Sequence, residues 1–550
     1  MSLSRSLQRL TPALAICALV SGTADATMRL GVNTHFEQGW PPKVLDRVVE
    51  SGAQGIRDSI SWGKIEKSPG QYDFDARNSG YLDVICKSST PVLLMVPMRN
   101  RVYDGGGPLT SPGAQAAYGR FVRAVVDRFP CVHAIEVGNE INAISRKFKE
   151  RPDKADLYVD LLRQVRGALD GGRRRVALVG GSSLMVATGF LGKLIDAGML
   201  PLVDAVAVHP YADRPEVLPA QIARLRAAMA RAGGVKPIWA TEFGLYYKTP
   251  EAAPPHGYKM MAILSAAGIG QADWYALLDE PWYPNMGLFA GGNPKPALQM
   301  FRRTARDLLT GGDAVRVDAG DPLTFIYRFG NGASVMWASA RPIRFAGGAV
   351  IHDAWGHLIS SPTMLGPDPI IVDAGARYEL GPIGVLADTL YDAGSNPWQA
   401  AVETRSGSHK PLSWIDTNWA SYLGVPGMPN VILSNTLVAV EGRSRKPVML
   451  VETLRSPISG ALWVSICLAR TKAPLPTVTV SLNGRRLSGN DGTADGSLPV
   501  TRLSVAAGDR IAISYATQGN GAARILRRVR ILAVAEQGAA LCPAPQSGTQ

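Results

Sequence analysis

Two glutamates stand at the ends of short apolar runs, and their positions suggest chemistry. Glu140 closes the run Ile-Glu-Val-Gly-Asn-Glu, and Glu242 closes Pro-Ile-Trp-Ala-Thr-Glu. A carboxylate at the mouth of a buried strand is unusual, because glutamate is rarely buried without a partner. If two carboxyl groups flank one cleft, one can donate a proton while the other stays ionised. That division of labour is what glycoside hydrolysis requires, and the separation of the two groups decides its stereochemical course.

The elements that must position the two glutamates are predicted strands. Most of these runs are continuously apolar rather than alternating, which favours parallel strands covered on both faces. There are eight of them between residues 28 and 309, at positions 29–33, 54–58, 92–97, 132–138, 176–180, 205–209, 237–242 and 271–278.

Helical patterns lie between the strands. Residues 111–128 and 154–169 carry apolar side chains at helical spacing, and residues 219–232 are rich in Ala, Arg and Leu. Strand and helix in alternation predict an α/β fold, a (β/α)8 TIM barrel. A doubly wound sheet would need a glycine-rich phosphate loop after its first strand, and residues 31–35 (GVNTH) do not form one.

In such a barrel the active site lies where the strands end. Glu140 and Glu242 follow the fourth and seventh strands, which places them on opposite walls of one cleft. Most of the other side chains on this predicted rim are polar or aromatic: Asn33, His35, Arg57, Asp58, Met98, Arg99, Asn139, Ser182, His209, Tyr211 and residues 274–279. A purely structural core does not need that set.

The chain changes character near residue 311, where helical periodicity stops. Strand-like runs follow, several separated by turn sequences such as Asn-Gly. We expect a barrel over residues 27–310, a small β-domain packed on it over 311–384, and an all-β sandwich over 385–550. Four tryptophans of the last region allow either carbohydrate binding or core packing, and the one within an apolar strand favours the core: Trp398, Trp414, Trp419 and Trp463.

The two glutamate segments resemble a known family. Residues 135–142 (IEVGNEIN) and 239–244 (WATEFG) look like the acid/base and nucleophile motifs of clan A retaining glycoside hydrolases. Residues 55–75 (GIRDSISWGKIEKSPGQYDFD) and 285–298 (NMGLFAGGNPKPAL) are similar to flanking segments of families 39 and 5. The organisation most resembles a family 39 hydrolase of bacterial exopolysaccharide systems, with family 5 next.

The resemblance implies roles for individual residues. Glu140 would be the acid/base and Glu242 the nucleophile, and Asn139 would bind the sugar 2-OH. Arg57 would help to keep the nucleophile ionised, because a nearby cation lowers a carboxyl pKa. The remaining candidates for positioning the sugar are His209, Tyr211, Trp274 as a subsite floor, His35, Trp62 and Trp282. For His35 and Trp62 structural packing is an open alternative.

The chain also departs from the family motif. The family has Trp before Asn-Glu and Pro after it, whereas Gly138 and Ile141 stand at these positions. Loss of the indole is expected to open the cleft locally. Glu136 lies on the same strand face as Glu140 but deeper, which favours a hydrogen-bonded supporting group over a rival acid.

The first 26 residues resemble an export signal. Arg5 and Arg9 precede a short apolar run, and Ala24-Asp25-Ala26 fits a cleavage site. The apolar run is too short for a membrane span, so no stable membrane anchor is expected. The protein is therefore expected to be exported, to the periplasm or the extracellular space.

Bulk composition narrows the partners. The chain is 46% hydrophobic and 19% charged, which is typical of soluble globular proteins. Its net charge of +13 suits an anionic polysaccharide. The basic residues are not interleaved with aromatics as in a nucleic-acid groove, so no nucleic-acid partner is expected.

Four cysteines follow the signal, an even number that permits disulfides in an exported protein. Cys86 precedes one predicted strand and Cys131 another, so this pair is a natural bridge, and Cys467 with Cys542 would staple the C-terminal region. The absence of a Cys-x-x-Cys pattern argues against structural zinc, and we expect neither a metal nor a cofactor.

Together these features predict an exported retaining β-glycoside hydrolase that acts on a bacterial exopolysaccharide or another β-linked polysaccharide, in an endo mode. The alternative is a non-catalytic barrel that binds polysaccharide and assists its assembly or export. An intact pair of glutamates favours the enzyme, because a binding protein has no need of it.

Overall fold

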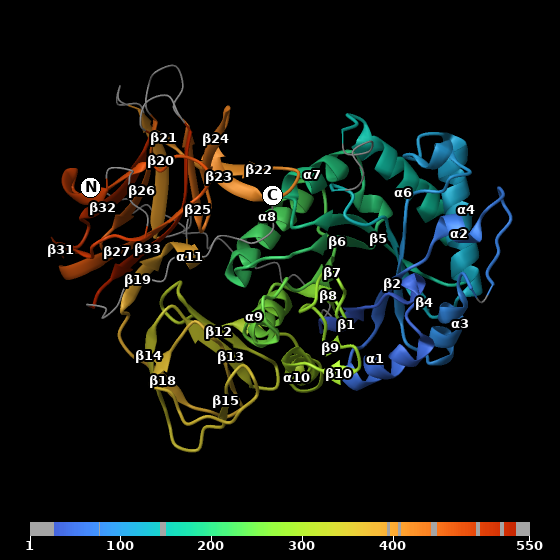
Figure 1. Ribbon diagram of the computed structural model, residues 1–550, viewed down its shortest axis with the longest axis horizontal. Helices are drawn as coiled ribbons and strands as arrows, with labels where there is room; N and C mark the ends of the chain where they lie inside the picture. The colour runs from blue at the N-terminus through green and yellow to red at the C-terminus, as the bar shows by residue number, and fades with distance from the viewer. Residues whose placement is uncertain are drawn as a thin grey trace, which may run out of the picture.

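The computed structural model describes residues 27–75, 77–143, 150–392, 397–404, 409–441, 448–490, 496–517 and 522–534. Three bodies follow one another along the chain. A barrel is succeeded by a small β-rich body and then by a larger two-sheet body, which lies beside the barrel (Figure 1). The predicted signal peptide, residues 1–26, lies outside the described residues.

Eight parallel strands close into a barrel in sequence order, with β1 paired to both β2 and β8. This confirms the predicted TIM barrel. The strands are β1 (Arg29–Asn33), β2 (Ile56–Ser59), β3 (Val92–Val96), β4 (Val132–Val137), β5 (Ala177–Leu184), β6 (Ala205–His209), β7 (Ile238–Phe243) and β8 (Ile269–Trp274).

Helices follow the strands and surround the barrel (Figure 1). Their apolar faces pack on the outside of the strands, and small or branched residues such as Leu93, Val179 and Ala207 fill the interior. The helices are α1 (Leu45–Ser51), α2 (Trp62–Ile65), α3 (Gly80–Lys87), α4 (Pro112–Arg128), α6 (Lys154–Asp170), α7 (Thr188–Asp196), α8 (Leu218–Arg231), α9 (Ala253–Ala266) and α10 (Pro296–Arg303).

Small antiparallel sheets follow the barrel. One has the order β11-β12-β13-β17-β15 and another β16-β14-β18. Trp337 of β13 is fully buried and donates to Glu216, which ties this body to the barrel. The strands are β11 (Val315–Arg316), β12 (Thr324–Arg328), β13 (Ser334–Ala338), β14 (Arg341–Phe345), β15 (Ile351–His352), β16 (Met364–Leu365), β17 (Ile370–Val372) and β18 (Tyr378–Leu380).

Two larger antiparallel sheets enclose the last hydrophobic core. The first contains β22 (Ser413–Asp416), β23 (Ser421–Val425), β24 (Met428–Leu433), β25 (Leu437–Glu441), β27 (Gly460–Arg470), β30 (Gly496–Ser497) and β33 (Ala522–Leu532), with β19 (Val385–Asp388) and β31 (Thr501–Val505) paired at its side. The second contains β20 (Trp398–Thr404), β21 (His409–Pro411), β26 (Val448–Arg455), β28 (Thr477–Leu482), β29 (Arg485–Asn490) and β32 (Arg510–Ala516). This confirms the predicted C-terminal sandwich.

Residues 431–441 are largely apolar, and this pattern predicts a single strand. They instead form the end of β24, a turn and β25, which pair antiparallel. At the turn, Ser434 donates its backbone N–H to the Leu437 carbonyl and accepts from the Leu437 N–H through its hydroxyl. The short polar turn was hidden by the apolar residues on either side.

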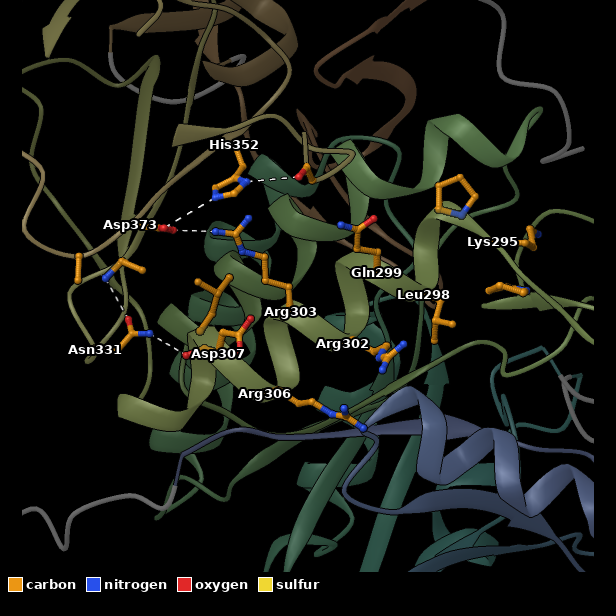
Figure 2. A pocket seen from close by; sticks show the side chains of 16 residues that line it. Lys295, Leu298, Gln299, Arg302, Arg303, Arg306, Asp307, Asn331, His352 and Asp373 are labelled. Atoms are coloured by element: carbon orange, nitrogen blue, oxygen red, sulfur yellow. Dashed lines mark hydrogen bonds and ion pairs between the residues drawn. The ribbon is translucent and has the colours of Figure 1, made fainter. Parts of the chain in front are cut away.

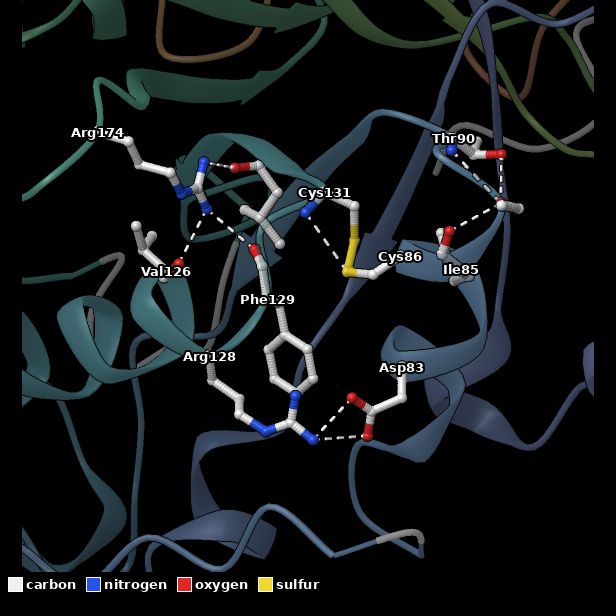
Figure 3. The surroundings of a disulfide bond; sticks show 11 residues. Asp83, Ile85, Cys86, Thr90, Val126, Arg128, Phe129, Cys131 and Arg174 are labelled. Carbon is white, nitrogen blue, oxygen red and sulfur yellow. Dashed lines mark hydrogen bonds and ion pairs between the residues drawn. A yellow bond between two sulfur atoms is a disulfide. The ribbon is translucent and has the colours of Figure 1, made fainter.

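A disulfide joins Cys86 to Cys131, with the two Cα atoms 4.8 Å apart (Figure 3). It links the end of α3 to the residue before β4, at the end of the strand away from Glu140. The other predicted bridge involves Cys542, which lies outside the described residues. None of the described helices combines the length and apolar composition needed to span a bilayer.

Candidate active site

Glu140 sits on a tight turn that leaves β4. Gly138 has φ of +77° and Glu140 itself φ of +46°, so the chain reverses within three residues. The turn is fixed by two backbone bonds, from Gly138 to the Val96 carbonyl and from Ile141 to the Ser182 carbonyl. About a quarter of the Glu140 side chain, 27%, is exposed to solvent.

Glu242 ends β7 on the opposite wall and is more deeply set, with 9% of its side chain exposed. Its Oε1 accepts from Arg57 at 2.7 Å and its Oε2 from the Tyr211 hydroxyl at 2.7 Å. Burial alone would raise the pKa of Glu242, but the charges of His209 and Arg57 and the tyrosine hydrogen bond hold it below its ordinary value. Glu242 is therefore ionised at neutral pH.

The two glutamates face each other. One carboxylate oxygen of Glu140, one of Glu242 and a ring nitrogen of His209 all lie within 4.8 Å of one another. In glycosidases, a carboxyl separation of about 5–5.5 Å goes with direct attack by one carboxylate, and about 6.5–9.5 Å with an intervening water. The short separation favours the first arrangement.

Arg57, on β2, organises the floor of the site. Besides Glu242, its guanidinium donates to Glu136 at 2.6 Å, to Asn33 at 2.9 Å and to Asn139 at 2.7 Å. The guanidinium is only 6% exposed, so each of these charge-assisted bonds lies in a weakly screened environment. Because the side-chain oxygen of Asn139 accepts from Arg57, its amide nitrogen is the group that can donate a hydrogen bond to a sugar hydroxyl.

Glu136 lies beneath the pair and is completely buried. Its Oε1 accepts from the Ser182 and Thr241 hydroxyls at 2.7 and 2.9 Å, while its Oε2 accepts from Arg57. Burial would raise the pKa of Glu136, but the charges of Arg57 and His209 and their hydrogen bonds to the carboxylate lower it to about 2. Glu136 is thus a permanently charged support for Arg57, not a proton donor.

His209 lies between the two glutamates and is fully buried. Its Nδ1 is 3.2 Å from Glu140 and 3.5 Å from Glu242. Burial alone would lower the pKa of His209, but the charge of Glu242 and two further carboxylates raise it to about 9. One nitrogen of His209 and one carboxylate oxygen each of Glu140 and Glu242 are also close enough together to hold a metal ion.

Comparison with solved structures identifies proteins of similar fold. A family 39 glycoside hydrolase from Bacteroides cellulosilyticus WH2 matches with a TM-score of 0.52 at 16% identity, over 64% of this chain and 81% of that one. The fold is shared with a family 39 glycoside hydrolase.

Two further solved structures are similar at lower scores. A family 39 β-xylosidase from Caulobacter crescentus has a TM-score of 0.45 at 14% identity, covering 63% of this chain and 96% of that one. A family 5 enzyme of subfamily 18 from Streptomyces cattleya, in complex with GlcNAc, has a TM-score of 0.43 at 18% identity. The match covers 52% of this chain and 81% of that one. No protein-family model and no curated protein matches the sequence.

One predicted sugar contact is wrong. Trp274 is completely buried, stacks on Tyr247 and donates its indole N–H to the Met286 carbonyl, so it cannot form a subsite floor. The next residue, Tyr275, is partly exposed, and its ring lies edge-on to His35 at 5.5 Å. Burial and the charge of Glu242 raise the pKa of Tyr275. The sequence placed Tyr275 on the predicted rim but favoured its neighbour Trp274 as the sugar contact.

Of the other aromatic candidates, one lies in the core and two lie at the rim. Trp62 is fully buried against Tyr103 and donates to Glu66, so it belongs to the core. His35 is 8% exposed and lies at the rim, 3.5 Å from Glu280. Trp282 is 58% exposed on the segment after β8, where it is accessible to a substrate.

The expected opening beside Gly138 is absent. A Cβ placed on Gly138 would lie 2.7 Å from a methyl group of Ile141 and 3.1 Å from the end of Met98. The space in the direction of the missing side chain is therefore already filled. The departure from the family motif does not enlarge the cleft at this point.

A cavity of about 1030 Å³ lies elsewhere, between α10 and the small β-rich body (Figure 2). It is basic, but two of its arginines are already engaged. Arg303 pairs with Asp373 at 2.7 Å, and Arg306 donates to backbone carbonyls of α1. We assign no role to this cavity.

Proposed function

We propose that this protein is a retaining β-glycoside hydrolase that cleaves a β-linked polysaccharide by double displacement. The observation that carries the proposal is the placement of Glu140 and Glu242, with carboxylate oxygens within 4.8 Å. The β configuration of the bond rests on the resemblance of their motifs to clan A hydrolases. A bacterial exopolysaccharide and an endo mode are the proposed substrate and action.

In the first step Glu242 attacks the anomeric carbon and Glu140 gives its proton to the departing oxygen. The sugar becomes covalently bound to Glu242, and Glu140 is left ionised. In the second step Glu140 takes a proton from water, and the resulting nucleophile releases the sugar with its original configuration. The nucleophile is ready at neutral pH because its pKa is lowered.

His209 is suited to both steps. Before attack the negative charge of the pair is on Glu242, and after attack it is on Glu140. The Nδ1 atom lies 3.5 Å from the first and 3.2 Å from the second, so a protonated imidazole stays close to the charge throughout. A site preorganised for moving charge lowers the barrier, because nothing must reorganise during the reaction.

A purely polysaccharide-binding role accounts less well for this site. Arg57, Tyr211 and His209 all direct charge or hydrogen bonds at Glu242. Burying so many charged groups has a free-energy cost that simple sugar binding does not require.

We also propose that the protein is exported to the periplasm or beyond. The N-terminal signal pattern supports this, and so does the disulfide between Cys86 and Cys131, because such bonds persist in oxidising compartments.

The test uses 2,4-dinitrophenyl β-glycosides of glucose, mannose and xylose together with the corresponding β-1,4-linked hexasaccharides. The anomer formed first, identified by proton NMR, should be β. Glu242→Gln should abolish turnover, and azide should restore turnover of the activated glycosides by Glu140→Ala. Glu251→Gln, an exposed glutamate beyond β7, is the control and should keep wild-type rates.

Several results would overturn the proposal. An α product would exclude retention, and full activity in Glu242→Gln would remove the nucleophile assignment. No turnover of any of these substrates by the wild-type protein would contradict a hydrolase of these linkages.

A further inference from the structure

The C-terminal sandwich reaches the barrel through the β22–β23 hairpin (Figure 1). Arg224 of α8 donates to both carboxylate oxygens of Asp416, at 3.2 and 2.6 Å, and its guanidinium lies 5.1 Å from the ring centre of Trp414. A Cβ on Gly189 of α7 would come within 2.5 Å of the Asp416 carbonyl oxygen, so the two backbones touch. The hairpin is therefore fixed on the barrel rather than loosely tethered.

The loop of this hairpin contacts the segment that carries the acid/base. Asn142 lies two residues after Glu140 and is buried. Its side-chain nitrogen donates to the Leu184 carbonyl at 3.0 Å and to the Asn418 carbonyl at 2.8 Å, and its oxygen accepts from the Leu184 N–H at 2.9 Å. One amide thus joins the loop after β4 and the last residue of β5 to the sandwich. The sandwich loop stands at the Glu140 edge of the cleft.

This loop holds Trp419 in a defined conformation. The Thr417 hydroxyl accepts from the backbone N–H groups of Trp419 and Ala420, at 3.1 and 3.2 Å, and donates to the Ala420 carbonyl at 2.7 Å. Asn418 is further anchored by Lys193 of α7 at 3.1 Å. Trp419 is 38% exposed, so part of its side chain is accessible to solvent from this turn.

We propose that Trp419 binds a sugar ring on the leaving-group side of the cleft. The inference rests on the proposed function. The acid gives its proton to the oxygen that departs with the leaving sugar, so the leaving portion of the chain lies on the Glu140 side. An indole face offers an apolar surface to the C–H face of a pyranose, and a rigid aromatic does so at little entropic cost.

Exposed aromatics at the opposite side of the rim fit the same substrate. Trp282 and Tyr283 are 58% and 43% exposed on the segment after β8, and Tyr246 lies edge-on to Tyr283 at 6.3 Å. A polysaccharide crossing the cleft would meet aromatic surfaces on both sides of the cleavage point. The sandwich would then form one wall of the binding site, rather than a separate carbohydrate-binding module.

The test compares a long substrate with a short one. For Trp419→Ala, the ratio of kcat/KM on the hexasaccharide to kcat/KM on the matching dinitrophenyl glycoside should fall about ten-fold, because one aromatic stacking contact is lost. Trp419→Phe keeps a flat ring and should restore most of the ratio. Leu358→Ala, which removes a 70% exposed apolar side chain of the small β-rich body, is the control and should leave the ratio unchanged.

Thermal unfolding of each variant separates misfolding from lost binding. An unchanged ratio in folded Trp419→Ala would overturn the inference while leaving the hydrolase assignment intact. Cleavage of the dinitrophenyl glycosides without cleavage of any hexasaccharide would also contradict it. If the wild-type protein cleaves neither class, the proposed function fails and the inference fails with it.

Discussion

Replacing Tyr211 by Phe removes the hydroxyl that donates a hydrogen bond to Glu242 and changes no other atom of the side chain. In the wild type this hydroxyl donates to Glu242 Oε2 at 2.7 Å and helps to hold the pKa of the carboxyl below its ordinary value. Phenylalanine keeps the ring, which packs edge-on against His209. The pKa of Glu242 should therefore rise in Tyr211→Phe.

The size of the rise follows from the strength of the bond. A hydrogen bond to a charged group contributes about 1.5–3 kcal/mol, and one pKa unit corresponds to about 1.4 kcal/mol. Complete loss would shift the pKa by about 1–2 units on these values. Tyr211 is half-buried at the cleft, so water partly replaces the hydroxyl, and we expect about 1 unit, the lower end of that range.

The assay is the pH dependence of kcat/KM on a dinitrophenyl glycoside, which reports ionisations of the free enzyme. Glu242 must be ionised to attack, so a higher pKa moves the acidic limb to higher pH. The control is Tyr247→Phe, which removes a buried tyrosine hydroxyl bonded to His256 at 2.9 Å and should leave the limb in place. An acidic limb at the same pH in Tyr211→Phe and wild type would refute the reasoning.

The same substitution should also lower the free energy of unfolding at neutral pH. A carboxyl with a lowered folded pKa contributes stability above its unfolded pKa, and this contribution is lost as the pH falls through the folded value. Tyr211→Phe should therefore be less stable than wild type at pH 7, and the difference should shrink under acid. Urea unfolding of both proteins at pH 7 and at acidic pH measures this difference in the free energy of unfolding.

Two further predictions concern stability. Removing the disulfide in the double variant Cys86→Ala/Cys131→Ala should lower the free energy of unfolding in urea by about 2–4 kcal/mol. The kcat should not change, because the bridge lies at the far end of β4 from Glu140. An unchanged free energy of unfolding would contradict this. Gly138→Ala should cost more stability than Gly70→Ala, since both glycines have φ of +77° but only at Gly138 would the new methyl meet a neighbour, at 2.7 Å. Equal losses in urea would show that the contact is unimportant.

The sequence was sufficient for the barrel and for the two glutamates because both depend on local patterns. Continuous apolar runs are what strands buried on both faces require. Glu140 lies three residues after β4, and Glu242 is the penultimate residue of β7. The supporting role of Glu136 was also predictable, since strand alternation placed it below Glu140.

The aromatic contacts were not predictable in the same way. Trp274 and Tyr275 are adjacent at the end of β8, and the sequence does not say which ring turns toward the cleft. The structure buries the larger ring and leaves the tyrosine partly exposed. The contact between Asn142 and Asn418 joins residues far apart in the chain, so it depends on how the sandwich docks, which no local pattern encodes.

Gly138 and Ile141, the two departures from the motif, are coupled because their side-chain positions compete for the same space. Gly138 adopts a left-handed conformation that glycine tolerates without a Cβ penalty, and Ile141 is completely buried with a methyl group where a side chain at 138 would begin. A tryptophan at 138 would collide with that methyl and with Met98. An isoleucine at 141 therefore compensates for the lost indole by filling its place from the other side of Glu140. Glu140 therefore keeps a packed support although both flanking positions differ from the motif that its segment resembles.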